Sequence, residues 1–135
     1  MPLLVDTGVL FALAYRKDAW HTRVRAYLES HPQTLLAPIT VLPEVAYLLR
    51  ERIGPQAERA FVASVAAGEV AVEHLTRHDW TRMDELMTRY GQLGLVDVSV
   101  VAIAERLKLH AIATTDRRDF GLVRPSHVAR FTLVP

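Results

Sequence analysis

The sequence predicts an α/β fold whose central sheet is mainly parallel and is flanked by helices. Two observations lead to this prediction. Short runs of consecutive apolar residues recur along the chain, as expected for strands that are buried on both faces of a sheet. Longer segments with apolar residues at helical spacing lie between these runs, so that strands and helices alternate. The 135 residues are 50% hydrophobic and 23% charged, which is enough apolar material for one globular domain over residues 1–135.

The expected strands are short and do not show the polar alternation of a half-exposed sheet. The first is a Leu-Leu-Val run that breaks off at Asp6, and the second is stopped by Pro38. The fourth ends at a second acid, Asp116, so two strands lead directly into carboxylates. The five expected strands cover residues 3–5, 35–37, 70–72, 111–115 and 131–134.

Helices are expected where apolar residues recur at three- and four-residue intervals. Trp20 and Val24 begin such a pattern, and Pro32 lies just beyond the end of that helix. Thr40 is the expected N-cap of the next helix, which Pro55 separates from the one that follows. The six expected helices cover residues 9–15, 18–30, 40–52, 55–67, 77–90 and 96–109.

The composition excludes several classes of protein. The chain contains no cysteine, which removes disulfides, thiolate zinc sites and cysteine nucleophiles. The first apolar run has no basic segment before it, and no run approaches the ~20 apolar residues that a membrane span requires. We therefore expect a cytoplasmic protein without a membrane segment. The net charge of +1 provides no general cationic field, so any contact with nucleic acid would depend on local arginines and on a metal ion.

Four carboxylates stand where the hydrophobic runs stop or where an apolar helix begins. Asp6 and Asp116 follow strands, and the ligands of parallel α/β sheets bind beyond the carboxyl ends of the strands. Glu44 and Asp97 lie near the starts of the helices expected at residues 40–52 and 96–109. A carboxylate near a hydrophobic core is destabilising unless its charge is paired, and we expect a divalent cation to be the partner.

Each acid also has a purely structural interpretation. Asp6 and Asp97 could cap helices, and Asp116 and Asp119 could belong to a solvated turn. Glu44 is the most informative of the set, because Val41, Glu44, Val45 and Leu48 share one helical face. A carboxylate inside a buried apolar stripe would be destabilising by several kcal/mol unless it were paired or bound to a metal.

Convergence of these acids would itself call for a cation. Two unit charges ~4 Å apart repel by about 4 kcal/mol at an effective dielectric constant of 20, which would keep some of the group protonated. Mg²⁺ or Mn²⁺ would relieve this repulsion, since hard cations prefer carboxylate oxygen. Zinc is not expected, because the six histidines are scattered and none forms a pair at ligand spacing.

Four segments of the chain resemble the PIN-domain family and, within it, the VapC-like toxins of toxin–antitoxin modules. They occur in the family's order and are LVDTGVL at residues 4–10, PEV at 43–45, LVDVS at 95–99 and ATTDRRDF at 113–120. The resemblance implies a PIN-like three-layer fold. It also implies that Asp6, Glu44, Asp97 and Asp116 are the acidic quartet of a Mg²⁺- or Mn²⁺-dependent endoribonuclease.

The resemblance further implies individual roles. Asp6, Asp97 and Asp116 would be the metal ligands, and Asp119 would be an auxiliary acid near the metal. Thr115, and less strongly Thr7, would orient the site through a hydroxyl group. Gly8 departs from the family, whose toxins often have serine there, and this puts one hydroxyl contact in doubt.

Substrate and partners are likewise expectations from the resemblance. It implies hydrolysis of single-stranded or loop RNA to a 5′-phosphate and a 3′-hydroxyl, with a metal-activated water as the nucleophile. Arg117 and Arg118 are candidate phosphate contacts, and a solvated turn is an equally good interpretation of both. A homodimer and a small cognate antitoxin would be the protein partners.

Two other functions share features with this sequence. The Asp-Thr-Gly triplet at residues 6–8 also occurs in aspartic proteases, but that chemistry needs two such triplets in an all-β setting, or one from each subunit of a dimer. The remaining alternative is a PIN-like module that binds RNA or protein without cleaving it. A substitution of Asp97 by Asn separates the two, since it would abolish cleavage and leave simple binding unchanged.

Overall fold

The computed structural model describes all residues 1–135 and contains a five-stranded sheet in which every strand pair is parallel. The strands are β1 (Leu3–Val5), β2 (Leu35–Pro38), β3 (Val70–Glu73), β4 (Ala111–Ala113) and β5 (Thr132–Val134). The helices are α1 (Thr7–Ala14), α2 (His21–Ser30), α3 (Val41–Arg52), α4 (Pro55–Ala66), α5 (Arg77–Arg89), α6 (Leu95–Leu107) and α7 (Arg117–Leu122). The α/β fold with a parallel sheet, predicted from the sequence, is confirmed.

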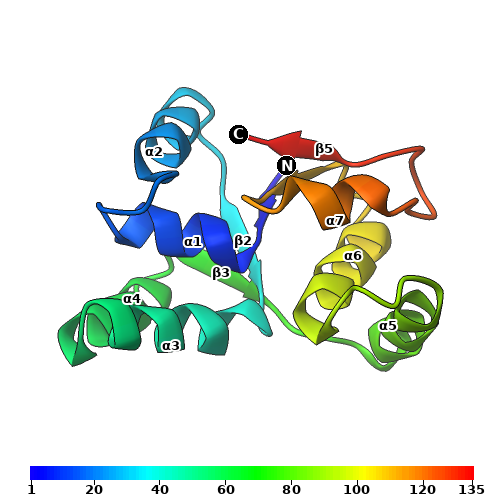
Figure 1. The fold of residues 1–135 in the computed structure, drawn as a ribbon, viewed down its shortest axis with the longest axis horizontal. Coiled ribbons are helices and arrows are strands. Elements are labelled where there is room, and N and C mark those ends of the chain that lie inside the picture. Colours follow the sequence, from blue (N-terminus) through cyan, green and yellow to red (C-terminus); the bar gives the residue numbers. More distant parts are fainter.

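The order of the strands in the sheet is β3-β2-β1-β4-β5. The chain therefore builds outward from β1 in one direction through β2 and β3, and then returns to the other side of β1 for β4 and β5. Helices α1 to α4 lie on one side of the sheet, and α5 and α6 lie on the other (Figure 1). The reversal of direction between β1 and β4 is the topological switch point at which such sheets bind their ligands.

The register of β1 and β4 determines which residues leave the sheet together. Val5 pairs with Ala113, and the backbone N–H of Asp6 donates to the carbonyl of Ala113 at 2.9 Å. Thr114 continues β4 by one residue, and its N–H donates to the carbonyl of Val134 in β5. Asp6 and Thr114 therefore emerge side by side at the switch point.

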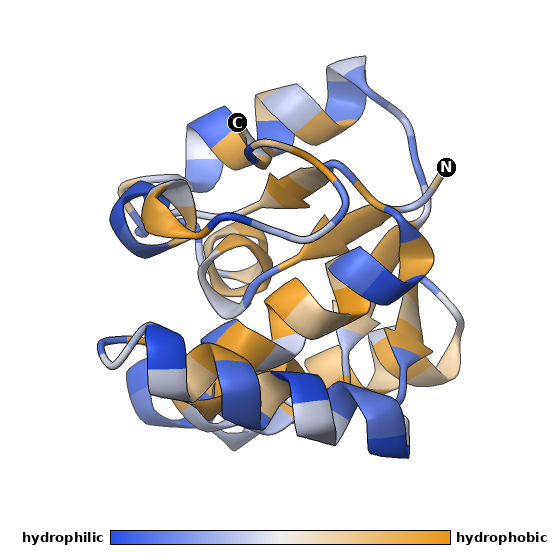
Figure 2. Ribbon diagram, turned by 90° about the vertical axis from the view of Figure 1, so that its right-hand side faces the viewer, coloured by the Kyte–Doolittle hydropathy of each residue, from blue (hydrophilic) through white to orange (hydrophobic).

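The strands and α6 form the centre of the hydrophobic core. Leu4, Val5 and Ile112 are fully buried, and α6 is buried without interruption from Val98 to Glu105. Apolar residues accordingly follow the strands and the inward surfaces of the helices, and hydrophilic residues cover the outer helix faces (Figure 2). Burial of this kind is worth roughly 25 cal/mol per Å² of apolar surface, so it is the main stabilising contribution.

The element boundaries lie within three residues of the expected ones. The helix expected from residue 18 begins at His21, because Asp18 forms a turn in which its Oδ1 accepts from the N–H of Trp20 at 2.8 Å. The strand expected at residues 111–115 ends at Ala113. One helix was not anticipated: α7 begins immediately after Asp116, in a stretch interpreted from the sequence as a turn.

Candidate active site

Asp6 lies at the switch point and is held by two hydrogen bonds. It is the N-cap of α1, and its Oδ1 accepts from the backbone N–H of Thr7 at 2.8 Å. Its Oδ2 accepts from the hydroxyl of Thr114 at 3.1 Å. Only 7% of the Asp6 surface is exposed, so its carboxylate has a fixed position in a largely dry environment.

Thr114 connects Asp6 to the next acid. Its side chain is fully buried, and while its hydroxyl donates to Asp6, the hydroxyl oxygen accepts from the backbone N–H of Asp116 at 2.9 Å. Asp116 in turn is the N-cap of α7, where its Oδ1 accepts from the N–H of Asp119 at 3.2 Å. One buried hydroxyl therefore fixes the relative positions of the segments that follow β1 and β4.

The hydroxyl that links Asp6 to Asp116 belongs to Thr114, which the sequence analysis did not single out, and the orienting role of Thr115 stays a prediction. Side chains alternate in an extended segment, so residues 114 and 116 are expected on one side of the backbone and residue 115 on the other. This two-residue period, combined with the pairing of β1 and β4, is the signal that would have identified Thr114 from the sequence.

Asp97 brings a third helix to the same place. It is the third residue of α6 and lies one turn after the N-cap of that helix, Gly94. Asp97, Asp116 and Asp119 can each offer a carboxylate oxygen such that all three oxygens lie within 4.8 Å of one another. Asp119, expected only as an auxiliary acid, belongs to this three-acid group, whereas Asp6 and Glu44 lie outside it.

Glu44 stands in the first turn of α3 and is exposed. The apolar face of α3 is Val41, Val45 and Leu49, and Glu44 lies beside this stripe rather than within it. The argument that its burial would require a charge partner is therefore wrong for this residue. Glu44 is nevertheless close enough for its charge to act on Asp6 and Asp97, which makes it a neighbour of the acidic cluster.

Burial and mutual repulsion disfavour the charged forms of these acids. Burial raises the pKa of Asp6 from 3.8 to about 6, although its hydrogen bonds from Thr7 and Thr114 act in the opposite direction. The charges of Asp97 and Glu44 add to the increase. The pKa of Asp97 is also raised, first by burial and then by the charge of Asp116.

No basic side chain neutralises the cluster. Six ion pairs occur in the structure, and none includes Asp6, Glu44, Asp97, Asp116 or Asp119. All of these acids lie at helix N-termini, whose partial positive charge favours anions by roughly 0.3–1 kcal/mol each. That gain is small beside the repulsion between carboxylates a few ångström apart.

The donor set therefore fits a hard divalent cation. It consists of carboxylate oxygens, with no sulfur or imidazole, which is the preference of Mg²⁺ and Mn²⁺. The hydroxyl of Thr7 is buried beside Asp6 and makes no hydrogen bond within the protein. Buried polar atoms nearly always have a partner, so this hydroxyl is available to water or a ligand of the site.

Gly8 and Thr115 are matched in shape. A Cβ atom at position 8 would collide with the Oγ1 of Thr115, so only glycine allows this close approach to the first turn of α1. The Thr115 hydroxyl makes no hydrogen bond within the protein.

Arg117 and Arg118 lie at the start of α7, directly after Asp116. Both are exposed and form no ion pair.

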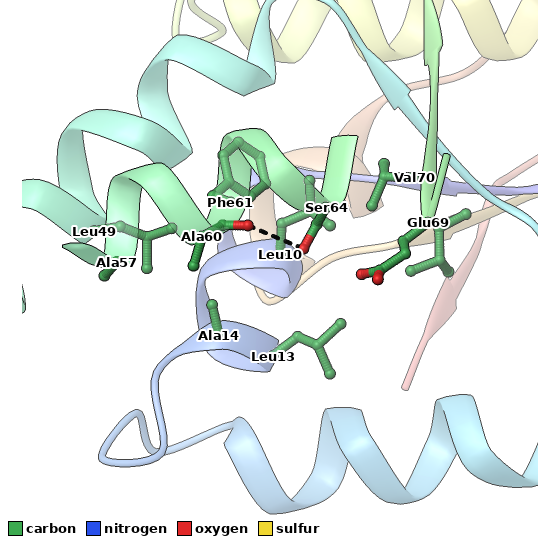
Figure 3. Close-up of a pocket in the computed structure, with 11 residues that line it drawn as sticks. Leu10, Leu13, Ala14, Leu49, Ala57, Ala60, Phe61, Ser64, Glu69 and Val70 are labelled. Carbon is green, nitrogen blue, oxygen red and sulfur yellow. Dashed lines mark hydrogen bonds between the residues drawn. The ribbon is translucent and has the colours of Figure 1, made fainter. Parts of the chain in front are cut away.

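An apolar pocket of ≈ 410 Å³ lies apart from the acids, and none of them lines it. Figure 3 shows it between α1, α3 and α4, with Glu69 as its one acid. The Ser64 hydroxyl at its wall donates to the carbonyl of Ala60 at 3.1 Å. Its lining offers no set of ligands for a metal or a phosphate: Leu10, Leu13, Ala14, Leu35, Leu49, Ala57, Ala60, Phe61, Ser64, Glu69 and Val70.

A family model described as the PIN domain matches residues 3–124, which is most of the chain. The chain belongs to the PIN domain family. The resemblance inferred from the four motifs is therefore confirmed at the level of the family. The PIN chain is also 28% identical over 135 residues to a curated protein, Ribonuclease VapC26 of Mycobacterium tuberculosis (strain ATCC 25618 / H37Rv), with 98% of this chain and 100% of the relative aligned.

Solved structures give the same assignment. VapC20 of Mycobacterium tuberculosis, described as a toxin that cleaves the sarcin–ricin loop, is 25% identical to this PIN chain, with a TM-score of 0.79 over 87% of this chain and 92% of the other. A toxin–antitoxin complex from Klebsiella pneumoniae has 20% identity and a TM-score of 0.70 over 90% and 92%. VapBC2 from Rickettsia felis, bound to a DNA fragment from the promoter, has 13% identity and a TM-score of 0.71 over both full chains. The last two likenesses show the fold alone.

Proposed function

We propose that this PIN chain is a Mg²⁺- or Mn²⁺-dependent endoribonuclease and the toxin of a toxin–antitoxin pair. The observation that carries the proposal is the group of unneutralised carboxylates at the switch point of the sheet. A binding module would have no reason to keep mutually repelling acids with raised pKa values in a half-buried position. The ribonuclease relative and the toxin structure described above support the same conclusion.

Asp97, Asp116 and Asp119 would hold the cation, and Asp6 and Glu44 would complete the acidic surroundings. When bound, a divalent cation would lower the pKa of a coordinated water molecule and offset the charge that develops on the phosphate. Thr114 would hold Asp6 and Asp116 in place through its shared hydroxyl. Such supporting contacts are what keep the ligands of a metal site in their productive arrangement.

Glu44 is the acid best suited to take a proton from the attacking water. It is exposed, and its carboxylate makes no hydrogen bond within the protein, whereas Asp6 is buried and each of its oxygens already accepts one hydrogen bond. A general base must be able to reach the proton that it removes, and a free carboxylate at the edge of the site can do so. Glu44 would therefore act on the proton rather than primarily on the metal.

The substrate would be RNA with an unpaired cleavage site. A single strand or loop can bend its phosphate toward acids at the end of a sheet, which an A-form duplex does not allow. Arg117 and Arg118 are unpaired cations next to Asp116, and we assign them to the phosphates that flank the cut. With a net charge of only +1, this local pair would supply most of the electrostatic attraction for RNA.

We further propose a cognate antitoxin and a homodimer as the protein partners, and a cytoplasmic location. Two of the structures with this fold are toxin–antitoxin assemblies, which supports the first of these. A guanidinium group from the antitoxin would pair bidentately with the carboxylates and so compete with the metal. No helix of the chain combines the length and the hydrophobicity needed to cross a membrane.

The decisive experiment is cleavage of end-labelled total RNA by antitoxin-free protein with Mg²⁺ or Mn²⁺. The controls are EDTA and the variant Asp97→Asn, which removes one charge from the repelling group and leaves the shape of the side chain unchanged. We expect discrete cuts that EDTA abolishes and that Asp97→Asn reduces by more than about 100-fold, since loss even of outer contacts to a metal site costs 10–100-fold. RNA binding that is indifferent to both metal and Asp97→Asn, without cleavage, would instead identify a binding module.

A further inference from the structure

The N-terminus of α3 is tied to the first turn of α6 by two hydroxyl groups. The Oγ1 of Thr40 lies 2.5 Å from the Oγ of Ser99. The Oγ of Ser99 also lies 2.6 Å from the carbonyl oxygen of Val96, to which it donates its single proton. Thr40 must therefore be the donor in the Thr40–Ser99 hydrogen bond.

This contact differs from what the sequence of α3 predicts. A threonine immediately before a helix usually accepts from an N–H of the first turn, and Thr40 occupies that position. Its side chain makes no such capping bond and is directed to α6 instead. The backbone of Thr40 is itself helical (φ −67°, ψ −26°), whereas a capping residue is usually extended, so its hydroxyl is left available to another element.

Ser99 is fully buried in one of the most apolar stretches of the chain, between Val98 and Val100. Alanine would fit this helix at least as well, and replacing a buried hydrogen-bonded pair by apolar groups is often nearly neutral for stability. The two hydroxyls are therefore hard to explain by folding stability alone. The hydrogen bond between them also fixes the position of the start of α3 relative to α6.

The position of the pair within the fold shows what it aligns. Thr40 lies one helical turn before Glu44, and Ser99 lies two residues after Asp97. Val96, the acceptor of Ser99, directly precedes Asp97. No other hydrogen bond in the structure joins α3 or its N-cap to α6.

We propose that the Thr40–Ser99 hydroxyl pair is a positioning device that holds Glu44 at a set distance from Asp97. This inference rests on the proposed function of the acidic cluster as a metal-dependent site. Thr40 and Ser99 touch neither metal nor substrate and are positioning residues. Without the pair, the repulsion between the acids would move the N-terminus of α3 outward, since that end of the helix carries the exposed carboxylate.

The test measures Mn²⁺ binding directly, from the free-ion EPR signal, together with the Mn²⁺ dependence of cleavage. The variants are Ser99→Ala, Thr40→Val, the double variant and Thr40→Ser, which keeps the hydroxyl. Thr76→Val is the matched control, because Thr76 is a threonine N-cap whose hydroxyl accepts from the N–H of Asp79 on α5, outside the acidic cluster. Thermal unfolding of each variant separates loss of stability from loss of alignment.

We expect Ser99→Ala and Thr40→Val each to weaken Mn²⁺ binding by about 10-fold, because the pair also anchors the start of α6, which carries the proposed metal ligand Asp97. This is the lower end of the range for contacts that orient metal ligands. The double variant should be no weaker than either, Thr40→Ser should resemble the parent protein, and Thr76→Val should lose stability with unchanged Mn²⁺ affinity. Equal Mn²⁺ binding by Thr40→Val and the parent protein would overturn the proposal while leaving the nuclease intact. A parent protein that neither binds Mn²⁺ nor cleaves RNA would overturn the proposed function, and the positioning role with it. Thr40 is half-buried, so Thr40→Val remains informative if Ser99→Ala does not fold.

Discussion

Two aspartates in this PIN chain are both helix caps and acids of the candidate active site. Asp6 caps α1 and Asp116 caps α7, each through one carboxylate oxygen. A carboxylate oxygen can accept more than one hydrogen bond, so a cap leaves acceptor capacity for a second purpose. The structural and functional interpretations of these residues are therefore compatible, and the helix starts orient the acids.

The raised pKa of Asp6 predicts how stability without metal depends on pH. The unfolded chain loses the Asp6 proton near pH 3.8 and the folded chain near pH 6, so between these values the folded state holds the additional proton. The free energy of unfolding should therefore fall as the pH rises from about 4 to 6, by up to about 3 kcal/mol from this residue. The pKa values of Asp79 and Glu105 are lowered instead, so stability from these two is lost only as the pH falls below about 4.5.

Urea unfolding in EDTA at several pH values, for the parent protein and Asp6→Asn, isolates the contribution of Asp6. The difference between the two proteins should grow from pH 4 to pH 6 and then level off. Asp84→Asn, at an exposed position on α5, should run parallel to the parent protein. A constant difference between parent and Asp6→Asn over this interval would contradict the prediction.

Gly8 and Thr115 should be energetically coupled. Gly8→Ala places a Cβ against the Thr115 hydroxyl and should destabilise by about 1–3 kcal/mol, despite the usual advantage of alanine in a helix. Thr115→Ala removes the obstructing oxygen and should restore most of that loss in the double variant. Chemical unfolding of the two single variants and the double variant measures the coupling, and additive effects would show that Thr115 simply rotates away.

At the scale of the elements, the spacing of apolar residues and the positions of glycine and proline predicted the fold well. The apolar run of β1, the Gly54–Pro55 break between α3 and α4, and the apolar spacing of α6 each led to an element at the right place. α7 was missed because six residues are too few for a helical pattern, and its cap, Asp116, was interpreted as a turn residue. Local sequence cannot distinguish a turn from the first turn of a short helix.

The site was predicted less completely than the fold, because hydrogen bonds between elements leave no local pattern. The proximity of the ends of β1 and β4, which lead into Asp6 and Asp116, follows from the strand order, which the alternation of strands and helices only suggests. The role of Thr114 depends on the register of β1 and β4. The hydrogen bond between Thr40 and Ser99 depends on where the start of α3 lies relative to α6 in the fold.

Between α5 and α6 lies a buried carboxylate, Glu105, whose charge is neutralised by Arg82, unlike the charges of the acidic cluster. Glu105 of α6 accepts from Arg82 of α5 at 2.7 Å and from the N–H of Ser126 at 2.7 Å. Glu105→Gln should destabilise by about 2 kcal/mol, below the range for fully buried pairs because Arg82 is partly exposed. Glu29→Gln, in the exposed pair with Arg25, should change stability by less than about 0.5 kcal/mol.

Both variants should cleave RNA as the parent protein does, because neither glutamate adjoins the acidic cluster. Denaturant titration and the RNA assay, carried out on the same preparations, test this pair of expectations. Equal stability of Glu105→Gln and Glu29→Gln would show that the buried network contributes nothing specific to the packing of α5.

At the scale of the whole molecule, the acids couple metal binding to folding. They come from segments that the unfolded chain holds far apart, so the cation should bind the folded state alone. Mn²⁺ at 100 times its dissociation constant should therefore raise the free energy of unfolding by about 2.7 kcal/mol. Unfolding curves at increasing Mn²⁺ should shift for the parent protein and hardly at all for Asp97→Asn, and equal shifts would place the ion elsewhere.

The dispersion of the acids along the chain has a consequence during translation. The first acid of the candidate site is residue 6 and the last is residue 119, so the ribosome adds β2, β3 and β4 between them. A nascent polypeptide on the ribosome therefore lacks the complete set of acids until residue 119 has been added. Under the proposed function, a chain cut short before β4 would lack Asp116 and Asp119 and would not cleave RNA.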